Sequence, residues 1–284
     1  MLDKCTTKSW ETSLYEPQQL YYNLMGEKIL TDKNVKSAYY MAKHKQSCDS
    51  PAWDGMTRTI LIDGMEQDQA WSLIRYHILH GPSDCVKRFD IPKSNGKTRP
   101  ISIYPLLDRV AQWCIMGPLS KACGPLLSPI NHAFQKGKSC KTAFEAFPPA
   151  GEAGYVICGD IHSFFDTVSH SLVRACLWSA GIRDSQLLHT INVTLKTPYK
   201  YPKQPKVRPE QGLPQGAPIS PLLANIILAY MDRYFVSLYG DQKLPRMVRY
   251  ADDFVIFCTD RKQAMTVQTQ MTWFIKYRLR LDLA

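Results

Sequence analysis

The spacing of hydrophobic residues predicts a chain built largely from amphipathic helices. Residues 66–80 place Trp71 and Ile74 on one side of a helical period, as expected for a helix that packs one face on a core. A mostly apolar helix is expected over 105–122, interrupted near Pro118. Further helices are predicted over 20–30, 35–44, 139–147, 169–180, 220–234 and 262–278.

Short runs of β-branched and aromatic residues predict strands between these helices. Residues 155–158 form one such run, and 246–258 form a second that reads as a hairpin. Segments 86–91 and 100–104 flank an Asn-Gly pair, which is a strong hairpin signal. The order of elements predicts an α+β fold, with helices packed on one face of a small antiparallel sheet.

The composition and net charge indicate which kind of partner the protein binds. The 284 residues are 45% hydrophobic and 21% charged, as in an ordinary soluble globular protein. The formal net charge is +10, which is typical of proteins that bind nucleic acid but also occurs in merely basic proteins. Nine scattered cysteines without a zinc-type spacing predict a reducing compartment, here the cytoplasm, and no apolar run is long enough to span a bilayer.

Acidic residues interrupt the apolar strands at two places. Asp252 and Asp253 lie inside the hairpin 246–258, and Asp160 follows the strand 155–158. An isolated Asp-Asp pair is most often a simple hairpin turn. If the two strands pair, however, the three carboxylates meet at one sheet edge, where they repel one another unless a cation neutralises them. Mg²⁺, which is bound by carboxylates and substrate phosphates, is the expected cation.

Four motifs resemble those of reverse transcriptases and occur in the order of that family. They are IPKSNGKTRPISI (91–103), DIHSFFD (160–166), QGLPQGAPISPLLANIIL (211–228) and YADD (250–253). VRYADDFVIF, SPLLAN and the upstream SPAWDGMT are especially similar to the bacterial group II intron branch, the maturase-type enzymes. Ala217 stands where that branch usually has a second glycine.

The resemblance implies the fingers and palm of a right-hand polymerase. Fingers are expected over 1–150, including the hairpin 86–104, and the palm over 151–284, with fingers residues interleaved around 175–215. The sequence ends at Ala284, before the region where the family has its thumb. We therefore expect either a fingers–palm piece or an unusually short enzyme.

The resemblance also implies roles for the acidic residues. Asp160, Asp252 and Asp253 are expected to be the catalytic carboxylates and metal ligands, with the backbone carbonyl of Ile161 completing the metal shell. Two Mg²⁺ ions are expected, with Mn²⁺ able to substitute.

Five further residues are implied for the incoming nucleotide. Lys93 and Arg99 match the cations that contact the triphosphate, and Gln215 and Gly216 match the loop over the nascent base pair. Phe165 matches the bulky residue that excludes a ribose 2′-OH. The alternative for the Phe164-Phe165 pair is a place in the core, and we expect this for one of the two.

Template and primer contacts are the least specific part of the pattern. Tyr250 and Ala251 are expected near the primer end. Lys136, Lys138 and Arg249 are expected to contact the nucleic-acid backbone, although each alone is more often a solvated surface charge.

These observations predict an RNA-directed DNA polymerase that copies RNA into cDNA, encoded by a group II intron and serving its mobility or splicing. An RNA template, a DNA or RNA primer, dNTPs and intron RNA are the expected partners, and the oligomeric state stays open, a dimer included. Two alternatives remain: a phage-defence or retron-like reverse transcriptase, and an intron-RNA-binding splicing cofactor with little polymerase activity.

Overall fold

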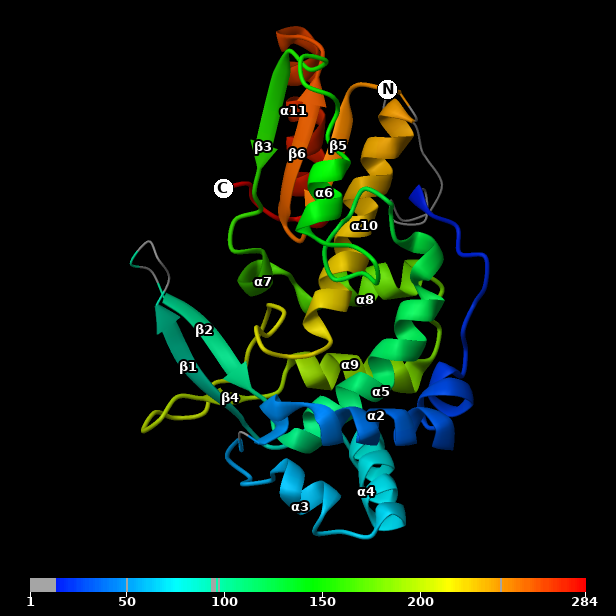
Figure 1. Ribbon diagram of the computed structural model, residues 1–284, viewed down its shortest axis with the longest axis vertical. Coiled ribbons are helices and arrows are strands. Elements are labelled where there is room, and N and C mark those ends of the chain that lie inside the picture. Colours follow the sequence, from blue (N-terminus) through cyan, green and yellow to red (C-terminus); the bar gives the residue numbers. More distant parts are fainter. Residues whose placement is uncertain (1–13, 50, 93–95, 97, 241) are drawn as a thin grey trace, which may run out of the picture.

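The computed structural model describes residues 14–49, 51–92, 96, 98–240 and 242–284. The molecule is elongated, with an antiparallel sheet at one end and a group of helices at the other (Figure 1). Between them run two long helices, α5 (Leu106–Ala122) and α10 (Ser220–Tyr239). A β-hairpin projects sideways below the first sheet. The molecule is thus α+β, as the sequence predicts.

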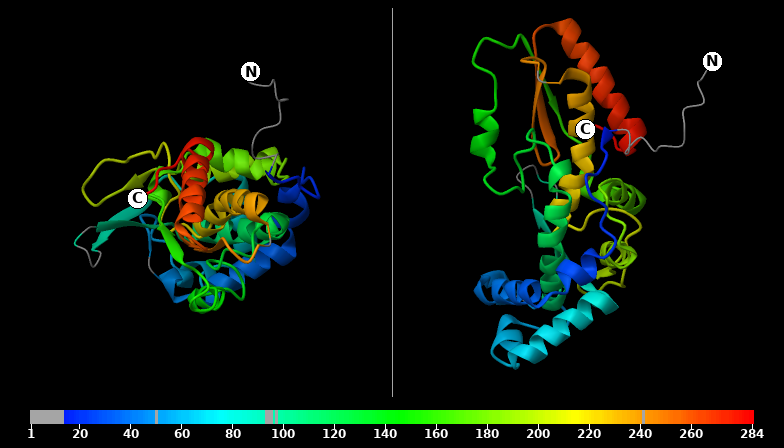
Figure 2. Two further views of the ribbon diagram at one scale, coloured as in Figure 1. Left: turned by 90° about the horizontal axis from the view of Figure 1, so that it is seen from above. Right: turned by 90° about the vertical axis from the view of Figure 1, so that its right-hand side faces the viewer.

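The upper sheet contains β3 (Tyr155–Gly159), β5 (Arg246–Tyr250) and β6 (Asp253–Cys258), in the order β3-β6-β5 with all pairs antiparallel. The side view in Figure 2 shows α10 and α11 (Arg261–Phe274) on one face, as predicted. A short helix, α6 (Cys140–Glu145), also covers part of the opposite face. On that face the ring centroids of Phe147 and Phe257 lie 4.8 Å apart, so apolar side chains are packed on both faces of the sheet.

The projecting hairpin belongs to a second sheet. Its strands β1 (Val86–Pro92) and β2 (Thr98–Ile103) pair antiparallel, and the two-residue strand β4 (Tyr199–Lys200) pairs parallel to β1. Among the described residues, its buried apolar cluster consists of Val86, Tyr104 and Ala217, with Tyr199 packed against them. These residues lie where β1 begins and β2 ends, and the other ends of the two strands project away from the helices.

The other helices form the scaffold around α5 and α10. Most predicted helices are confirmed within a few residues, whereas α9 and the short helices α3 and α7 were not expected. The remaining bounds are η1 Met25–Ile29, α2 Asp32–His44, η2 Gln46–Asp49, α3 Arg58–Ile62, α4 Gln67–His80, η3 Gly124–Leu126, α7 Phe164–Thr167, α8 His170–Ser179, α9 Ser185–Leu195 and η4 Ile275–Leu279. None of the helices in the described part of the chain is both long and apolar enough to cross a bilayer.

The predicted interruption of α5 at Pro118 is wrong. Proline has no N–H, so the carbonyl four residues earlier loses its usual helical partner. In this protein that carbonyl belongs to Cys114, and the side-chain amide of Asn34 donates to it at 2.8 Å. A residue of α2 thus replaces the missing hydrogen bond, and α5 continues through the proline.

Helix α10 occupies the centre of the molecule because its sequence is apolar on every side. Leu223, Ile227 and Tyr230 are completely buried, and so is Asp232. A helix that is hydrophobic all round is expected in a core and not on a surface. Its first residue, Ser220, follows directly on the Gly/Pro-rich loop, so α10 connects this loop to the back of the upper sheet.

Candidate active site

The turn between β5 and β6 carries the adjacent aspartates. Tyr250 and Asp253 are the last paired residues, which leaves Ala251 and Asp252 at the tip. Ala251 has φ 57°, a left-handed conformation that few non-glycine residues adopt. On the other side of β6, Gly159 pairs with Phe254, so Asp160 follows directly beside Asp253. The predicted convergence of the three aspartates on one sheet edge is therefore found.

Gly159 is necessary for this convergence. A Cβ at residue 159 would lie 2.2 Å from the ring of Phe254. Glycine lets the buried Phe254 ring pass against the end of β3, which keeps the two strands in register up to Asp160.

The electrostatics of the turn reflect this crowding. Burial raises the pKa of the half-buried Asp252, and the nearby charges of Asp160 and Asp253 raise it further, while Arg99 opposes the shift. Burial and Asp160 likewise raise the pKa of Asp253. Three mutually repelling carboxylates at one edge make a site that favours a bound cation.

The donors fit a hard divalent ion whose shell is completed by substrate. Carboxylate and carbonyl oxygens are the ligands that Mg²⁺ prefers. Among the residues that the structure describes, no three Asp, Glu, His or Cys side chains form a finished metal cage. Mg²⁺ commonly uses only one or two carboxylates together with substrate phosphates, so such a cage is not required. The Ile161 carbonyl accepts the N–H of Phe164 at 3.3 Å and has a second lone pair for another partner.

The loop before α10 joins β2 of the projecting sheet to α7, the short helix that follows β3. Gln215 accepts a hydrogen bond from Nε of Arg99 at 2.5 Å and donates to Asp166 at 3.5 Å. Its backbone carbonyl accepts the N–H of Ser102 in β2 at 2.8 Å. The exposed Arg99 therefore lies against the loop. Lys93 lies outside the described residues.

Gly216 is required by the same contact. Its φ is 105°, and a Cβ there would lie 2.1 Å from the carbonyl oxygen of Ser102. On the other side, Gly212 and Leu213 donate to the carbonyls of Val168 and Phe165 at 2.7 and 2.6 Å. The loop is thus held from both sides at its backbone, and Gly216 is the residue that permits the close approach to β2.

The two phenylalanines of the DIHSFFD motif divide as expected. Phe164 is 1% exposed and belongs to the main core. Phe165 is half-buried and meets Phe164 edge-on, with ring centroids 5.5 Å apart. It lines a hollow of about 320 Å³ together with Asp166, Gln211 and Pro214. Phe165 is therefore the ring that a bound molecule can reach.

The residues expected at the template and primer have different surroundings. Tyr250 is 37% exposed, and a hydrogen bond with Cys140 raises the pKa of its hydroxyl. Lys136 is exposed, whereas Lys138 is half-buried and its Nζ donates to the carbonyl of Pro129 at 3.3 Å. Ala251 lies at the tip of the turn between β5 and β6.

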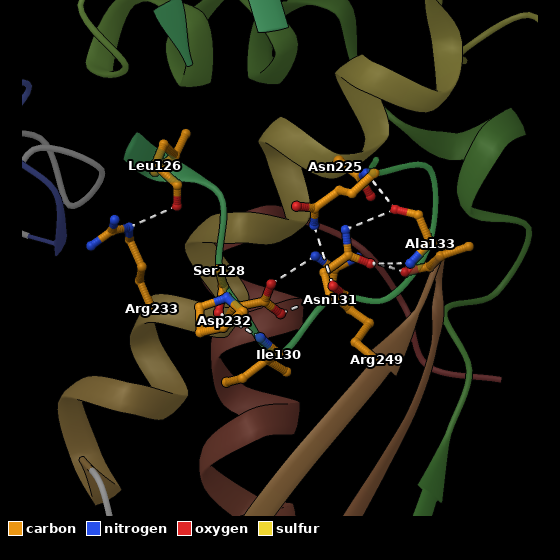
Figure 3. A network of polar contacts seen from close by, with 12 residues as sticks. Leu126, Ser128, Ile130, Asn131, Ala133, Asn225, Asp232, Arg233 and Arg249 are labelled. Carbon is orange, nitrogen blue, oxygen red and sulfur yellow. Dashed lines mark hydrogen bonds and ion pairs between the residues drawn. The ribbon is translucent and has the colours of Figure 1, made fainter. Parts of the chain in front are cut away.

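Arg249 does not lie on the surface, so the expectation of a template contact is corrected. The residue is completely buried, and its Nε and one terminal nitrogen donate to the carboxylate of Asp232 at 2.8 and 2.7 Å (Figure 3). Sequence reasoning missed Asp232. Its signal was an acidic residue inside the otherwise apolar run of α10, which requires a buried partner.

Comparison with known proteins agrees with this geometry. Residues 91–284 match the family model described as reverse transcriptase (RNA-dependent DNA polymerase). The protein YkfC of Escherichia coli is 30% identical over 82% of this chain and 70% of its own length. The group II intron-encoded protein LtrA of Lactococcus lactis is 31% identical over 54% of this chain. A putative COX1/OXI3 intron 1 protein of Saccharomyces cerevisiae is 30% identical over 57% of it.

The chain spans only part of two of these relatives, 26% of LtrA and 20% of the yeast protein. The matched region nevertheless includes the turn with Asp252 and Asp253, the loop with Gln215 and the strand that precedes Asp160. The chain belongs to the reverse transcriptase family, the RNA-dependent DNA polymerases.

Proposed function

We propose that this chain is the fingers and palm region of an RNA-directed DNA polymerase that copies RNA into cDNA and is encoded by a group II intron for its mobility or splicing. The observation that carries the proposal is the meeting of Asp160 with Asp252 and Asp253, beside the Arg99–Gln215 pair. In this proposal residues 1–150 form the fingers and 151–284 the palm, and residues around 175–215 contribute to the fingers.

The reaction would be attack of a primer 3′-OH on the α-phosphate of a dNTP, with release of pyrophosphate. Asp160, Asp252 and Asp253, with the Ile161 carbonyl, would hold two divalent ions, Mg²⁺ or in its place Mn²⁺. When bound, these ions would neutralise charge and activate the hydroxyl. The protein itself would mainly orient the reactants, which is what phosphoryl transfer requires of it.

The remaining residues would bind the nucleotide and the primer. Arg99 and Lys93 would contact the triphosphate, and Gln215 would orient the nucleotide from the loop that Gly216 fixes on β2. The accessible ring of Phe165 would exclude a ribose 2′-OH.

Nucleic acid would follow the basic surface of the chain. Lys136 and Lys138 would contact the backbone of template or primer, and Tyr250 and Ala251 would lie near the primer end. The net charge of +10 supports an RNA template, a DNA or RNA primer and intron RNA as partners. A retron-like enzyme would use the same site, and the intron-encoded relatives favour the intron assignment.

Primer extension on an RNA template with Mg²⁺ tests this function. We expect the wild-type chain to incorporate dNTPs and the Asp252→Asn/Asp253→Asn variant to lose at least about a hundredfold in rate, because the ions lose their charged ligands. Asp68→Asn, which neutralises a carboxylate in the first turn of α4, is the matched control and should stay active. Equal incorporation by wild type and double variant would refute the site, and a wild-type chain inactive with both Mg²⁺ and Mn²⁺ would refute the activity.

A further inference from the structure

Arg249 and Asp232 form an ion pair that is removed from water and takes no part in the proposed chemistry. Their side chains are 1% and 0% exposed, and two parallel hydrogen bonds join them. Burying two charges costs free energy that the pair recovers only partly, and apolar residues of similar size often replace such pairs without loss of stability. A contribution to stability alone therefore does not explain why this pair is present.

The third interaction of the guanidinium gives a reason. The other terminal nitrogen of Arg249 donates to the carbonyl of Ala251 at 2.8 Å. Ala251 is the left-handed residue immediately before Asp252. Its conformation is unfavourable for alanine and must be held by its surroundings. The planar guanidinium of Arg249 thus connects Asp232 of α10 with the backbone of the turn.

The backbone of Arg249 is fixed to the same helix by a second route. Its N–H donates to the carbonyl of Ile130 at 3.0 Å, and its carbonyl accepts the N–H of His132 at 2.8 Å. The segment 125–133 is in turn attached to α10 (Figure 3). Asn225 donates to the carbonyl of Ala133 at 2.9 Å, and Arg233 donates to two carbonyls at the start of the segment.

Helix α10 also holds the loop that carries Gln215. The hydroxyl of Ser220, the first residue of the helix, donates to the carbonyl of Pro214 at 2.8 Å. One helix therefore touches both halves of the site. Its N-terminus is hydrogen-bonded to the loop that carries Gln215. Further along, Asp232 is hydrogen-bonded to Arg249, which contacts the turn between β5 and β6.

We propose that Arg249, oriented by Asp232, is a positioning residue that holds the Ala251–Asp252 turn in the conformation in which Asp252 faces Asp160. The role rests on the proposed function, because the turn matters only if its carboxylates bind the reacting groups. The guanidinium touches neither substrate nor metal in this scheme. It acts through the Ala251 carbonyl.

Three variants separate positioning from plain stability. Arg249→Met leaves Asp232 buried without its partner, so the melting temperature should fall. Asp232→Leu/Arg249→Met removes both charges, so the melting temperature should return close to the wild-type value, while Ala251 still lacks its donor. Tyr230→Phe is the matched control, because it deletes a buried hydrogen bond that the same helix makes to the Cys176 carbonyl of α8 and not to the turn.

Two measurements are made on each variant. Hydrogen–deuterium exchange of peptides covering 246–254, without substrate or metal, should be about tenfold faster in Arg249→Met and in the double variant than in wild type or Tyr230→Phe. In primer extension, kcat should fall at least about tenfold in the same two variants. The KM for dNTP should stay unchanged, because the loop that carries Gln215 keeps its contacts.

The outcomes are distinct. A stable double variant with wild-type exchange and wild-type kcat would overturn the proposal and leave the pair a purely structural element. If the variants exchange faster at the turn but the wild-type chain shows no polymerase activity, the proposed function is rejected and the positioning role is kept. If the double variant does not fold, Arg249→Lys decides, because one ammonium group keeps the charge next to Asp232 but cannot make all three hydrogen bonds. Wild-type exchange in Arg249→Lys would contradict the proposal.

Discussion

The two small sheets of this protein have opposite relations to the core. In the upper sheet, Ile256 and Cys258 are completely buried, and helices cover one face and part of the other. In the projecting sheet, exposure increases along β1 toward the hairpin tip, and Ile91 is 44% exposed. The carboxylates thus lie on the strongly packed sheet, and Arg99 lies on the weakly packed one. The comparison teaches that the two halves of the site have different support: packing fixes the acids, whereas the basic hairpin depends on a few hydrogen bonds to the loop at Gln215.

The largest expected effect tests the packing difference directly. Ile256→Ala should lower the free energy of unfolding by about 2–5 kcal/mol, because it opens a cavity in a buried strand. Ile91→Ala removes the same atoms from a half-exposed position and should cost less than about 0.5 kcal/mol. Urea denaturation of both variants measures the difference, and similar losses would show that the two sheets are supported alike.

Next in size is the effect of the exposed cation. Arg99→Gln should lower kcat/KM for dNTP about 10- to 100-fold, because a charge-assisted contact to phosphate is lost together with the hydrogen bond to Gln215. Stability should hardly change, since Arg99 is exposed. Arg99→Lys keeps the charge but not the planar geometry and should recover only part of the activity. A stability loss comparable to that of Ile256→Ala would contradict the proposed division of roles.

Gly216 tests the junction between this loop and β2 of the projecting sheet. Gly216→Ala should cost about 1–3 kcal/mol, because the new Cβ would lie 2.1 Å from the Ser102 carbonyl and φ is positive. Gly137→Ala is the matched control: its φ is 77°, but a Cβ there would meet nothing within 4 Å. Thermal denaturation of both variants isolates the cost of the contact with β2. Equal losses would mean that backbone conformation alone requires glycine.

The smallest effect concerns the carboxylates in the absence of metal. Because the pKa of Asp252 is raised in the folded protein, the folded state binds this proton more tightly than the unfolded chain. The metal-free protein should therefore lose stability as the pH rises from the ordinary Asp range through the raised value. The loss should be at most about 1 kcal/mol, because water screens the half-buried group.

Asp252→Asn should lack this component and, in a chelator at neutral pH, melt slightly above wild type. Melting curves between pH 3 and pH 7 measure it, with Asp68→Asn as the control for a lost surface charge. Identical pH profiles for wild type and Asp252→Asn would show that folding does not raise the pKa of Asp252.

The sequence predicted those parts of the site that depend on local pattern. The strand before Asp160, the hairpin around Asp252 and the Gly/Pro-rich loop each have a signal within a few residues. The burial of Arg249 depends on Asp232 in another element, and the continuity of α5 through Pro118 depends on Asn34. Partners in distant elements leave little trace in the spacing of hydrophobic residues within one segment.

Two missed elements differ in kind. Strand β4 has only two residues, too few for any alternating pattern, and exists because β1 pairs with it. Helix α9 had a usable signal: Asp184 caps it, and Leu187, Leu188 and Ile191 follow at helical spacing. The first could be found only in three dimensions, whereas the second was available in the sequence.

The central position of α10 has a consequence for changes of chain length. Each residue added to an α-helix advances the chain by about 1.5 Å and rotates it by about 100°. A single insertion or deletion between Ser220 and Asp232 would turn the acid away from Arg249 while leaving every side chain type in place. This stretch of helix should therefore tolerate apolar substitutions of similar volume better than any indel, and loop grafting or circular permutation of this protein should leave its length untouched.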